Sequence, residues 1–263
     1  MASLQLPGGE LYYEVEGDGI PVVLVHGLAL DARMWDDQVP ALVDVATLVR
    51  YDVRGFGRST RDAATPYSNA GDLWQLLDHL GIAEAVLVGL SMGGRVVVEA
   101  TLAAPERVLA LVLLDAVLDG VPWDPDSARG MDAIGEELRA GGLDAAKAVW
   151  LRHGFFAPAR HDPVVARRLA EMVGGYSGVN WTSADPHEPH PPTRELLPTI
   201  AAPTTVVVGE LDVPCFREMA EVLADRIPDA RLVTVPDAGH MVNMEAPEPV
   251  NAVLRDVLTT LGR

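Results

Sequence analysis

The sequence has few of the features that mark secreted or membrane-spanning proteins. It contains one cysteine, Cys215, so a disulfide within the chain is impossible. No apolar run reaches the roughly 20 residues of a membrane-spanning helix. The first residues, Met1 to Gly8, lack a basic segment followed by an apolar one, so they do not resemble a secretory signal. We therefore expect a cytoplasmic protein.

Positive charge is also scarce. Lys147 is the only lysine, and 38 acidic residues against 20 basic ones give a net charge of −18. Such a surface repels phosphate backbones and anionic lipids, so we expect neither a nucleic acid nor a membrane as a partner. The expected partner is a small-molecule substrate, and the sequence contains no indication of an oligomeric state.

Apolar sequence is abundant, with 49% hydrophobic residues arranged in short blocks. Expected strands lie at 11–16, 21–26, 46–52, 85–89, 108–115, 204–209 and 231–236. Helical patterns lie between them, at 34–43, 69–80, 92–104, 216–227 and 249–261. The later strands are nearly continuous runs of Val and Leu, which is typical of strands buried on both faces. The alternation predicts an α/β fold with a doubly wound, mostly parallel sheet flanked by helices.

One segment interrupts this alternation. From about residue 116 to 200 there is no convincing buried strand, only helical stretches near 130–140, 144–153 and 164–173 and a proline-rich piece at 185–192. A chain of 263 residues suits one domain that carries an insertion. We therefore expect a single domain, 1–263, in which residues 116–200 form a helical cap over one end of the sheet.

The candidate nucleophile is Ser91, in the sequence Gly89-Leu90-Ser91-Met92-Gly93. A β-rich run precedes this G-x-S-x-G motif and a helical pattern follows it, which is the setting in which the motif carries chemistry. A serine on so tight a strand-to-helix turn projects its hydroxyl outwards, and the two glycines leave room where side chains would collide. The alternative is a serine that only caps the following helix.

A serine nucleophile needs a base and an orienting carboxylate. Among the seven histidines, His240 follows the last expected strand, and α/β sites assemble at the carboxyl ends of strands. Asp212 follows the strand before it and is the preferred acid. Asp115, at the end of an earlier strand, is the rival acid. Glu210 is a weaker candidate, whose alternative role is that of a solvated turn residue.

These motifs, in this order, resemble the α/β-hydrolase family over nearly the whole chain. They comprise His26-Gly27, Met34-Trp35, the stretch from Asp52 to Ser59, the serine motif, Asp212 and Gly239-His240. Met34-Trp35-Asp36 together with Arg50-Tyr51-Asp52 resembles the branch of small serine esterases and 3-oxoadipate enol-lactonases. The resemblance implies a catalytic triad of Ser91, His240 and Asp212. The serine at position 91 excludes the carboxylate nucleophile of haloalkane dehalogenases and epoxide hydrolases.

The same resemblance assigns two backbone N–H groups to an oxyanion hole. One comes from the loop after His26-Gly27, at Leu28, and the other from Met92, the residue after the nucleophile. Both donate through the main chain, so their side chains can be apolar. His26 is then expected to brace its loop by side-chain hydrogen bonds, and Arg54 to brace loops rather than contact substrate.

The resemblance implies no cofactor and no metal. His187 and His190 with Glu188 suggest a metal site, but the prolines around them favour a rigid surface loop.

The expected cap is rich in aromatic residues. It contains Trp123, Trp150, Phe155, Phe156 and Trp181. We expect Trp123, Trp150, Phe155 and Trp181 to line an apolar substrate pocket, and the alternative is that they pack the cap helices together.

The expected reaction is hydrolysis of a carboxylic ester or lactone through an acyl-enzyme. Two alternatives stay open. Perhydrolysis, acyl transfer and carbon–carbon bond hydrolysis occur on similar constellations, and the acyl products distinguish them. Some receptors for small signalling molecules also resemble this fold and keep an intact triad. Slow single turnover with a stable covalent adduct and a ligand-dependent protein partner would identify a receptor.

Overall fold

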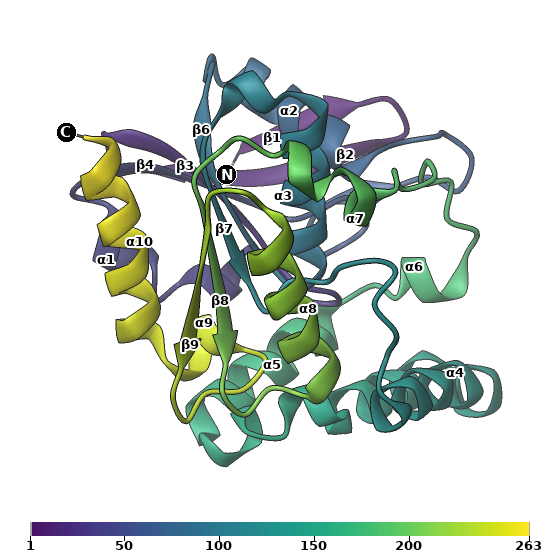
Figure 1. Cartoon of the computed structure of the whole chain (residues 1–263). Helices are drawn as coiled ribbons and strands as arrows, with labels where there is room; N and C mark the ends of the chain where they lie inside the picture. Colours follow the sequence, from purple (N-terminus) through teal and green to yellow (C-terminus); the bar gives the residue numbers. More distant parts are fainter. Residues whose placement is uncertain (1, 263) are drawn as a thin grey trace.

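The computed structural model describes residues 2–262, and one twisted sheet runs through its centre (Figure 1). Its strands are β1 (Ala2–Leu6), β2 (Gly9–Glu16), β3 (Ile20–Val25), β4 (Ala46–Tyr51), β5 (Thr60–Arg61), β6 (Ala85–Leu90), β7 (Val108–Leu114), β8 (Thr204–Gly209) and β9 (Ala230–Val235). They lie in the order β1-β2-β4-β3-β6-β7-β8-β9, with β5 paired to β2. β2 is antiparallel to β1, β4 and β5, whereas the strands from β4 to β9 run parallel.

The parallel strands follow the apolar blocks of the sequence because helices cover both of their faces. Every residue of β6 and β8 is buried, and so are all but one of β7. β1 and β5 were not expected, because β1 is a largely exposed edge strand and β5 has only two residues. Neither contains the buried run that a sequence pattern reveals.

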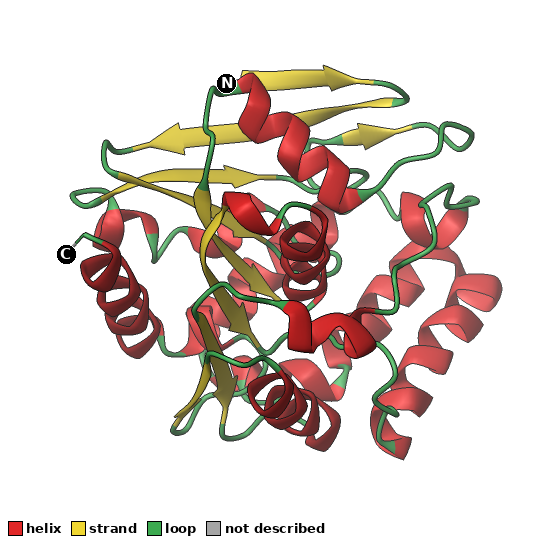
Figure 2. Cartoon of the chain, turned by 45° about the horizontal axis from the view of Figure 1, so that its top comes forward, coloured by secondary structure: helices red, strands yellow, loops and turns green. Residues whose placement is uncertain are grey.

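Helices pack on both faces of the sheet, which confirms the predicted doubly wound, mostly parallel architecture. They are α1 (Val39–Leu42), α2 (Asn69–His79), α3 (Met92–Ala103), α4 (Pro125–Arg152), α5 (Pro163–Gly175), α6 (Val179–Thr182), α7 (Thr193–Leu196), α8 (Pro214–Arg226), α9 (Val242–Glu245) and α10 (Pro247–Leu261). Short 3-10 turns are η1 (Ala32–Trp35), η2 (Pro105–Arg107), η3 (Gly154–Phe156), η4 (Ala159–His161) and η5 (Leu197–Thr199). α2, α3 and α8 cover one face, and α1 and α10 cover the other (Figure 1; Figure 2). Within residues 2–262, no helix has the length and apolar character needed to cross a membrane.

The helix expected at 34–43 is wrong. The chain forms η1 there and then, after a short link, the single turn α1. Pro40 explains the break, because it has no N–H to donate and its ring would clash with the carbonyl of Asp36 in a continuous helix. Asp31 instead caps η1, accepting a hydrogen bond from Arg33 N at 3.1 Å.

Residues 116–200, here called the helical insertion, connect β7 to β8. This fully described stretch holds helices α4 to α7 and no strand. α4 and α5 lie at the carboxyl ends of the parallel strands, and α7 packs beside α3 (Figure 1). α4 breaks at Gly142, whose φ of 79° and ψ of −169° suit only glycine. The break separates the two helical stretches expected at 130–140 and 144–153. The third expected stretch, at 164–173, is α5.

Arg54 braces two loops from within the protein, as expected. Its Nε and Nη2 donate to the two carboxylate oxygens of Asp72 at 2.6 and 2.8 Å, and its Nη1 donates to Pro7 O at 2.9 Å. Both side chains of the pair are 3% exposed. Burial raises the pKa of Asp72, and the neighbouring Arg54 opposes that rise. Each of the two buried charges is therefore stabilised by the other.

We predict that Arg54→Ala lowers the free energy of unfolding by about 3 kcal/mol or more, because it leaves the Asp72 carboxylate buried without its partner. Arg129→Ala is the control. It removes a surface ion pair with Asp126, whose side chain is 88% exposed, and should change stability little. Urea unfolding measures both variants, and equal effects would contradict the assignment.

Candidate active site

Ser91 occupies the turn between β6 and α3 in a backbone conformation that residues with a side chain rarely adopt. Its φ is 54° and its ψ is −115°, a strain of about 1–3 kcal/mol. Ser91 N donates to Leu114 O at 3.0 Å and holds the turn against β7. A Cβ on Gly89 would lie 2.2 Å from Gly93 O, and one on Gly93 would lie 2.1 Å from Val25 O. This close packing explains both glycines of the motif.

His240 lies within hydrogen-bonding distance of Ser91 on one side and of Asp212 on the other. Nε2 is 3.0 Å from Ser91 Oγ, and Nδ1 is 2.8 Å from Asp212 Oδ2. An Nδ1–H that donates to the carboxylate leaves the Nε2 lone pair free to accept the serine hydroxyl. All three residues are buried, and Ser91 is the most accessible at 8%. This arrangement can remove the hydroxyl proton of Ser91 in a site shielded from water.

Two neighbouring parallel strands position the acid and the base. Asp212 follows β8 in a turn closed by its own N–H, which donates to Gly209 O at 3.1 Å. Val213 N donates to Asp212 Oδ1 at 2.7 Å and fixes the carboxylate. A Cβ on Gly209 would lie 2.2 Å from Gly239 O, so the end of β8 touches the loop that carries His240.

Glu245, at the end of α9, holds the loop of His240 in place, a role that the sequence did not indicate. Gly239 N donates to its Oε2 at 2.8 Å, and Met241 N donates to its Oε1 at 2.9 Å. Burial raises the pKa of Glu245, and these two hydrogen bonds oppose the rise. The one available signal was a carboxylate at short spacing after the histidine, and only the folded turn shows that it points back at the loop.

Asp115, the rival acid, makes a different contact. Its Oδ1 accepts from Gly209 N at 2.9 Å. An oxygen of Asp115, an oxygen of Asp212 and a ring nitrogen of His240 lie within 4.8 Å of one another. Burial, followed by the charge of Asp212, raises the pKa of Asp115 well above its usual value. The hydrogen bond of the imidazole goes to Asp212, and that of Asp115 goes to the backbone of Gly209.

Two other reactive residues near the site take no part in this chain of contacts. Glu210 is exposed, and its Oε2 accepts from Asp237 N at 3.3 Å, which suits a turn residue. Cys215 is buried, and its burial raises the pKa of the thiol to about 11. A thiol of this kind is a poor nucleophile at neutral pH.

The backbone N–H groups of Leu28 and Met92 lie on chain segments that meet at Ser91. Met92 is the first residue of α3, where a helix leaves its N–H groups without intrahelical partners. A Cβ on Gly27 would lie 3.6 Å from Ser91 Cβ, so the loop that carries Leu28 passes beside the serine. Within residues 2–262, Leu28 N–H makes no hydrogen bond. Both groups are therefore available to an oxygen at the site.

His26 braces the loop of Leu28 by two hydrogen bonds. Its Nδ1 donates to Gly27 O at 2.8 Å, and its Nε2 accepts from Val53 N at 2.9 Å. Burial lowers the pKa of His26, which favours the neutral ring that this pair of bonds requires. The bracing role expected from the sequence agrees with these contacts.

Aromatic rings pack against His240. The ring centroid of Phe216, on α8, is 4.1 Å from that of His240, and the centroid of Phe155, on η3, is 5.0 Å away. Trp123 packs against both phenylalanines, at 5.7 and 5.8 Å, and is 38% exposed. Phe216 was not expected at the site, because its sequence position lies in a core helix outside the insertion.

Trp150 and Trp181 lie behind this first set of rings. Trp150 is 4% exposed, with Phe155 at 5.8 Å and Phe156 at 5.1 Å. Trp181 lies 6.3 Å from Trp150 and 5.1 Å from Tyr176. These contacts are those of residues that pack the insertion together, whereas Trp123 and Phe155 lie closer to His240.

The chain is similar to known proteins over most of its length. A family model described as "alpha/beta hydrolase fold" matches residues 20–247. RutD of Azorhizobium caulinodans, a protein named as a carbamate hydrolase, is 31% identical over 256 residues, which cover 93% of each chain.

Solved structures are similar over almost the whole chain. A thermophilic esterase from Thermogutta terrifontis superposes with a TM-score of 0.83 and 30% identity, covering 99% of both chains. An enol-lactonase from Burkholderia xenovorans LB400 superposes with a TM-score of 0.79 and 27% identity, covering 98% of this chain and 100% of that one.

The contact of Asp212 with His240 predicts unequal effects of two conservative substitutions. Asp212→Asn should lower kcat on an activated ester by about 10⁴-fold, because an amide permits the wrong imidazole tautomer. Asp115→Asn should lower kcat less than about tenfold, because an amide oxygen still accepts from Gly209 N. Circular dichroism checks that both variants are folded. A severe loss of kcat confined to Asp115→Asn would identify Asp115, at the end of β7, as the orienting acid.

Proposed function

The chain belongs to the α/β-hydrolase family, and from this premise we propose that it is a serine hydrolase that cleaves carboxylic esters or lactones through an acyl-enzyme. The resemblance of its motifs to the esterase and enol-lactonase branch is confirmed at the level of the family. The observation that carries the proposal is the continuous chain of contacts from Ser91 Oγ through His240 to Asp212, at 3.0 and 2.8 Å. We propose that these residues are the nucleophile, the base and the orienting acid.

Acylation uses the geometry as it stands. Ser91 Oγ attacks the carbonyl carbon of the substrate while His240 Nε2 takes the hydroxyl proton. The Asp212 carboxylate stabilises the imidazolium that forms. When the tetrahedral intermediate collapses, His240 gives the proton to the departing alcohol oxygen, and the acyl group remains on Ser91. His240 then takes a proton from water, whose oxygen attacks the acyl carbon. When this second intermediate collapses, His240 returns the proton to Ser91 Oγ and the acid leaves.

We propose that the backbone N–H groups of Leu28 and Met92 stabilise the oxyanion. Both lie beside Ser91, and Met92 stands at the N-terminus of α3, where the helix dipole also favours negative charge. Donors of this kind act on charge that develops in the transition state, so they accelerate the reaction rather than only binding substrate. No side chain needs to move for them to act.

The substrate pocket is proposed to lie between the helical insertion, acting as a cap, and His240. Phe155 and Phe216 pack on the imidazole, and the partly exposed Trp123 continues this apolar surface outwards. Rings in these positions favour an acyl or alcohol group of small to medium size without charge. The net charge of −18 also disfavours the approach of anionic substrates. We further propose that the enzyme is cytoplasmic.

Carbamate hydrolysis is the second candidate, favoured by the 31% identity to RutD. A carbamate presents the same carbonyl carbon to Ser91, and the same oxyanion donors apply. The two activities differ in the leaving group and in the carbon dioxide or carbamic acid released. Assaying simple carbamates beside esters and lactones of matched size separates the candidates. Product analysis with hydrogen peroxide or a second alcohol present tests acyl transfer.

Ser91→Ala tests the proposal. The variant should lose roughly four to six orders of magnitude in kcat/KM on p-nitrophenyl esters and on lactones alike, because the nucleophile is gone. The small side chain of alanine fits the same turn, so the thermal unfolding midpoint should stay close to that of the wild type. Near-wild-type activity in the purified variant would refute the mechanism. Activity in the wild type on carbamates alone would replace the ester and lactone assignment.

A matched pair of tryptophans tests the pocket. Trp123→Ala should raise KM for longer p-nitrophenyl esters severalfold with little change in stability, because this side chain is 38% exposed beside Phe155. Trp150→Ala should instead lower the free energy of unfolding by about 3–5 kcal/mol, because it empties a buried site. Chain-length profiles and urea unfolding measure the two effects. A profile unchanged in Trp123→Ala would place the pocket elsewhere.

A further inference from the structure

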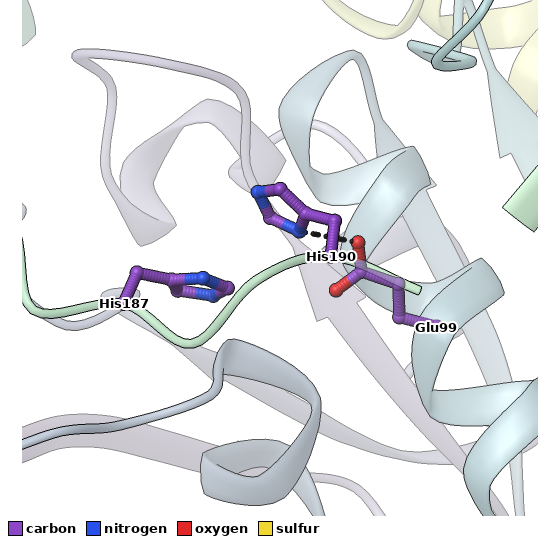
Figure 3. A group of neighbouring side chains, drawn as sticks. All are labelled: Glu99, His187 and His190. Carbon is purple, nitrogen blue, oxygen red and sulfur yellow. Dashed lines mark hydrogen bonds and ion pairs between the residues drawn. The ribbon is translucent and has the colours of Figure 1, made fainter. Parts of the chain in front are cut away.

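A second group of reactive side chains lies where the chain leaves the helical insertion (Figure 3). Glu99 stands on α3, about 12 Å along the helix from Ser91, and His187 and His190 come from the proline-rich loop at 185–192. One oxygen of Glu99 and one ring nitrogen of each histidine lie within 4.8 Å of one another. The shortest contact joins His190 Nδ1 to Glu99 Oε1 at 2.6 Å. Two segments far apart in the sequence thus bring three donor atoms together.

His187 is already oriented as a metal-binding histidine would be. Its Nδ1 lies 2.5 Å from Glu188 O, so this nitrogen carries the proton and Nε2 keeps its lone pair. A backbone carbonyl behind the non-ligating nitrogen is a usual partner of metal-bound histidine. Nε2 accepts only a long hydrogen bond, 3.3 Å, from Asn69 N, which a metal ion would replace.

The loop that carries the two histidines is anchored to the core. Glu188 N donates to Tyr67 O at 2.8 Å, and Tyr67 Oη donates to Asp185 Oδ1 at 3.0 Å. The prolines between 185 and 192 restrict the backbone further. The side chain of Glu99 is 4% exposed and that of His190 is 32% exposed, so an ion can reach the group from solvent. The donors are therefore held close together before any ion arrives.

We propose that Glu99, His187 and His190 bind a divalent transition-metal ion such as Zn²⁺, with water in the fourth position. Two imidazole nitrogens and one carboxylate oxygen are ligands that Zn²⁺ prefers. Donor atoms in a tetrahedral zinc site lie about 3.3 Å apart. On binding the ion, the distance between His190 Nδ1 and Glu99 Oε1 would increase from 2.6 Å, and the ring of His187 would move towards these two atoms. Rotations of the three side chains allow both changes.

This proposal departs from the expectation from the sequence, which weighed a site of His187, His190 and Glu188 but favoured a rigid surface loop without metal. Glu188 is exposed and contributes its backbone carbonyl behind His187. Glu99 takes the third position because folding brings α3 against the loop. A bound ion would tie the end of the helical insertion to α3, and so it would stabilise the folded state without entering the chemistry at Ser91.

Calorimetric titration of EDTA-treated, dialysed full-length protein with ZnCl₂ tests the proposal. We expect a saturable site whose Kd rises at least about tenfold in His190→Asn and in Glu99→Gln. At about a hundred times Kd, Zn²⁺ should raise the unfolding midpoint of the wild type by about 5 °C and leave that of His190→Asn unchanged. His190 is partly exposed, so its replacement is expected to fold, and its esterase activity without zinc should equal that of the wild type.

Two controls make the result specific. His161→Asn removes an exposed histidine of the insertion outside the group and should leave the Kd unchanged. His240→Asn reports on the other group of potential ligands, Asp115, Asp212 and His240. Zinc affinity unchanged in both Glu99→Gln and His190→Asn would overturn the proposal. Zinc binding lost only in His240→Asn would also overturn it, by assigning the ion to the catalytic group.

Discussion

The backbone of Ser91, at a φ of 54°, is held by packing that leaves no space for side chains at Gly89 and Gly93. This packing holds the end of β6, the start of α3 and the end of β3 close together. The same packing therefore places the serine hydroxyl, the first N–H of α3 and the loop of Leu28 around one point. A larger residue at either glycine would separate all three at once, since a Cβ on Gly93 would lie 2.1 Å from Val25 O.

The charged groups are arranged around this turn with little freedom to move. β8 and β9 end side by side, so Asp212 and His240 meet although 27 residues separate them in the sequence. Burial and the neighbouring Asp212 raise the pKa of Asp115, and only Asp212 makes a hydrogen bond with the imidazole. Glu245 fixes the backbone on either side of His240, and Phe155 and Phe216 exclude water from the ring. Orientation and low water access then favour proton transfer from Ser91.

The sequence predicted the parallel sheet and the loops of Ser91, Asp212 and His240, because buried strands and tight turns demand particular residue types. It did not predict features that depend on distant segments. Pro40 divides the expected first helix, and the edge strand β1 has no buried run to reveal it. Only the folded chain brings Glu245 to the backbone on either side of His240 and Phe216 to its ring, and both positions are typical of ordinary helix residues. For the same reason the sequence did not indicate Glu99 beside His187 and His190, because α3 and the loop meet only in the folded chain.

The proposed mechanism requires that Ser91 carries the acyl group. Incubation of the wild type with an alkyl fluorophosphonate, which phosphonylates activated serines, followed by proteolysis and mass spectrometry of the peptides, tests this claim directly. We expect one adduct per chain, located on Ser91 and prevented by prior occupancy of the site with a slowly hydrolysed ester. An adduct on another residue, or an unmodified Ser91 in folded and active protein, would contradict it.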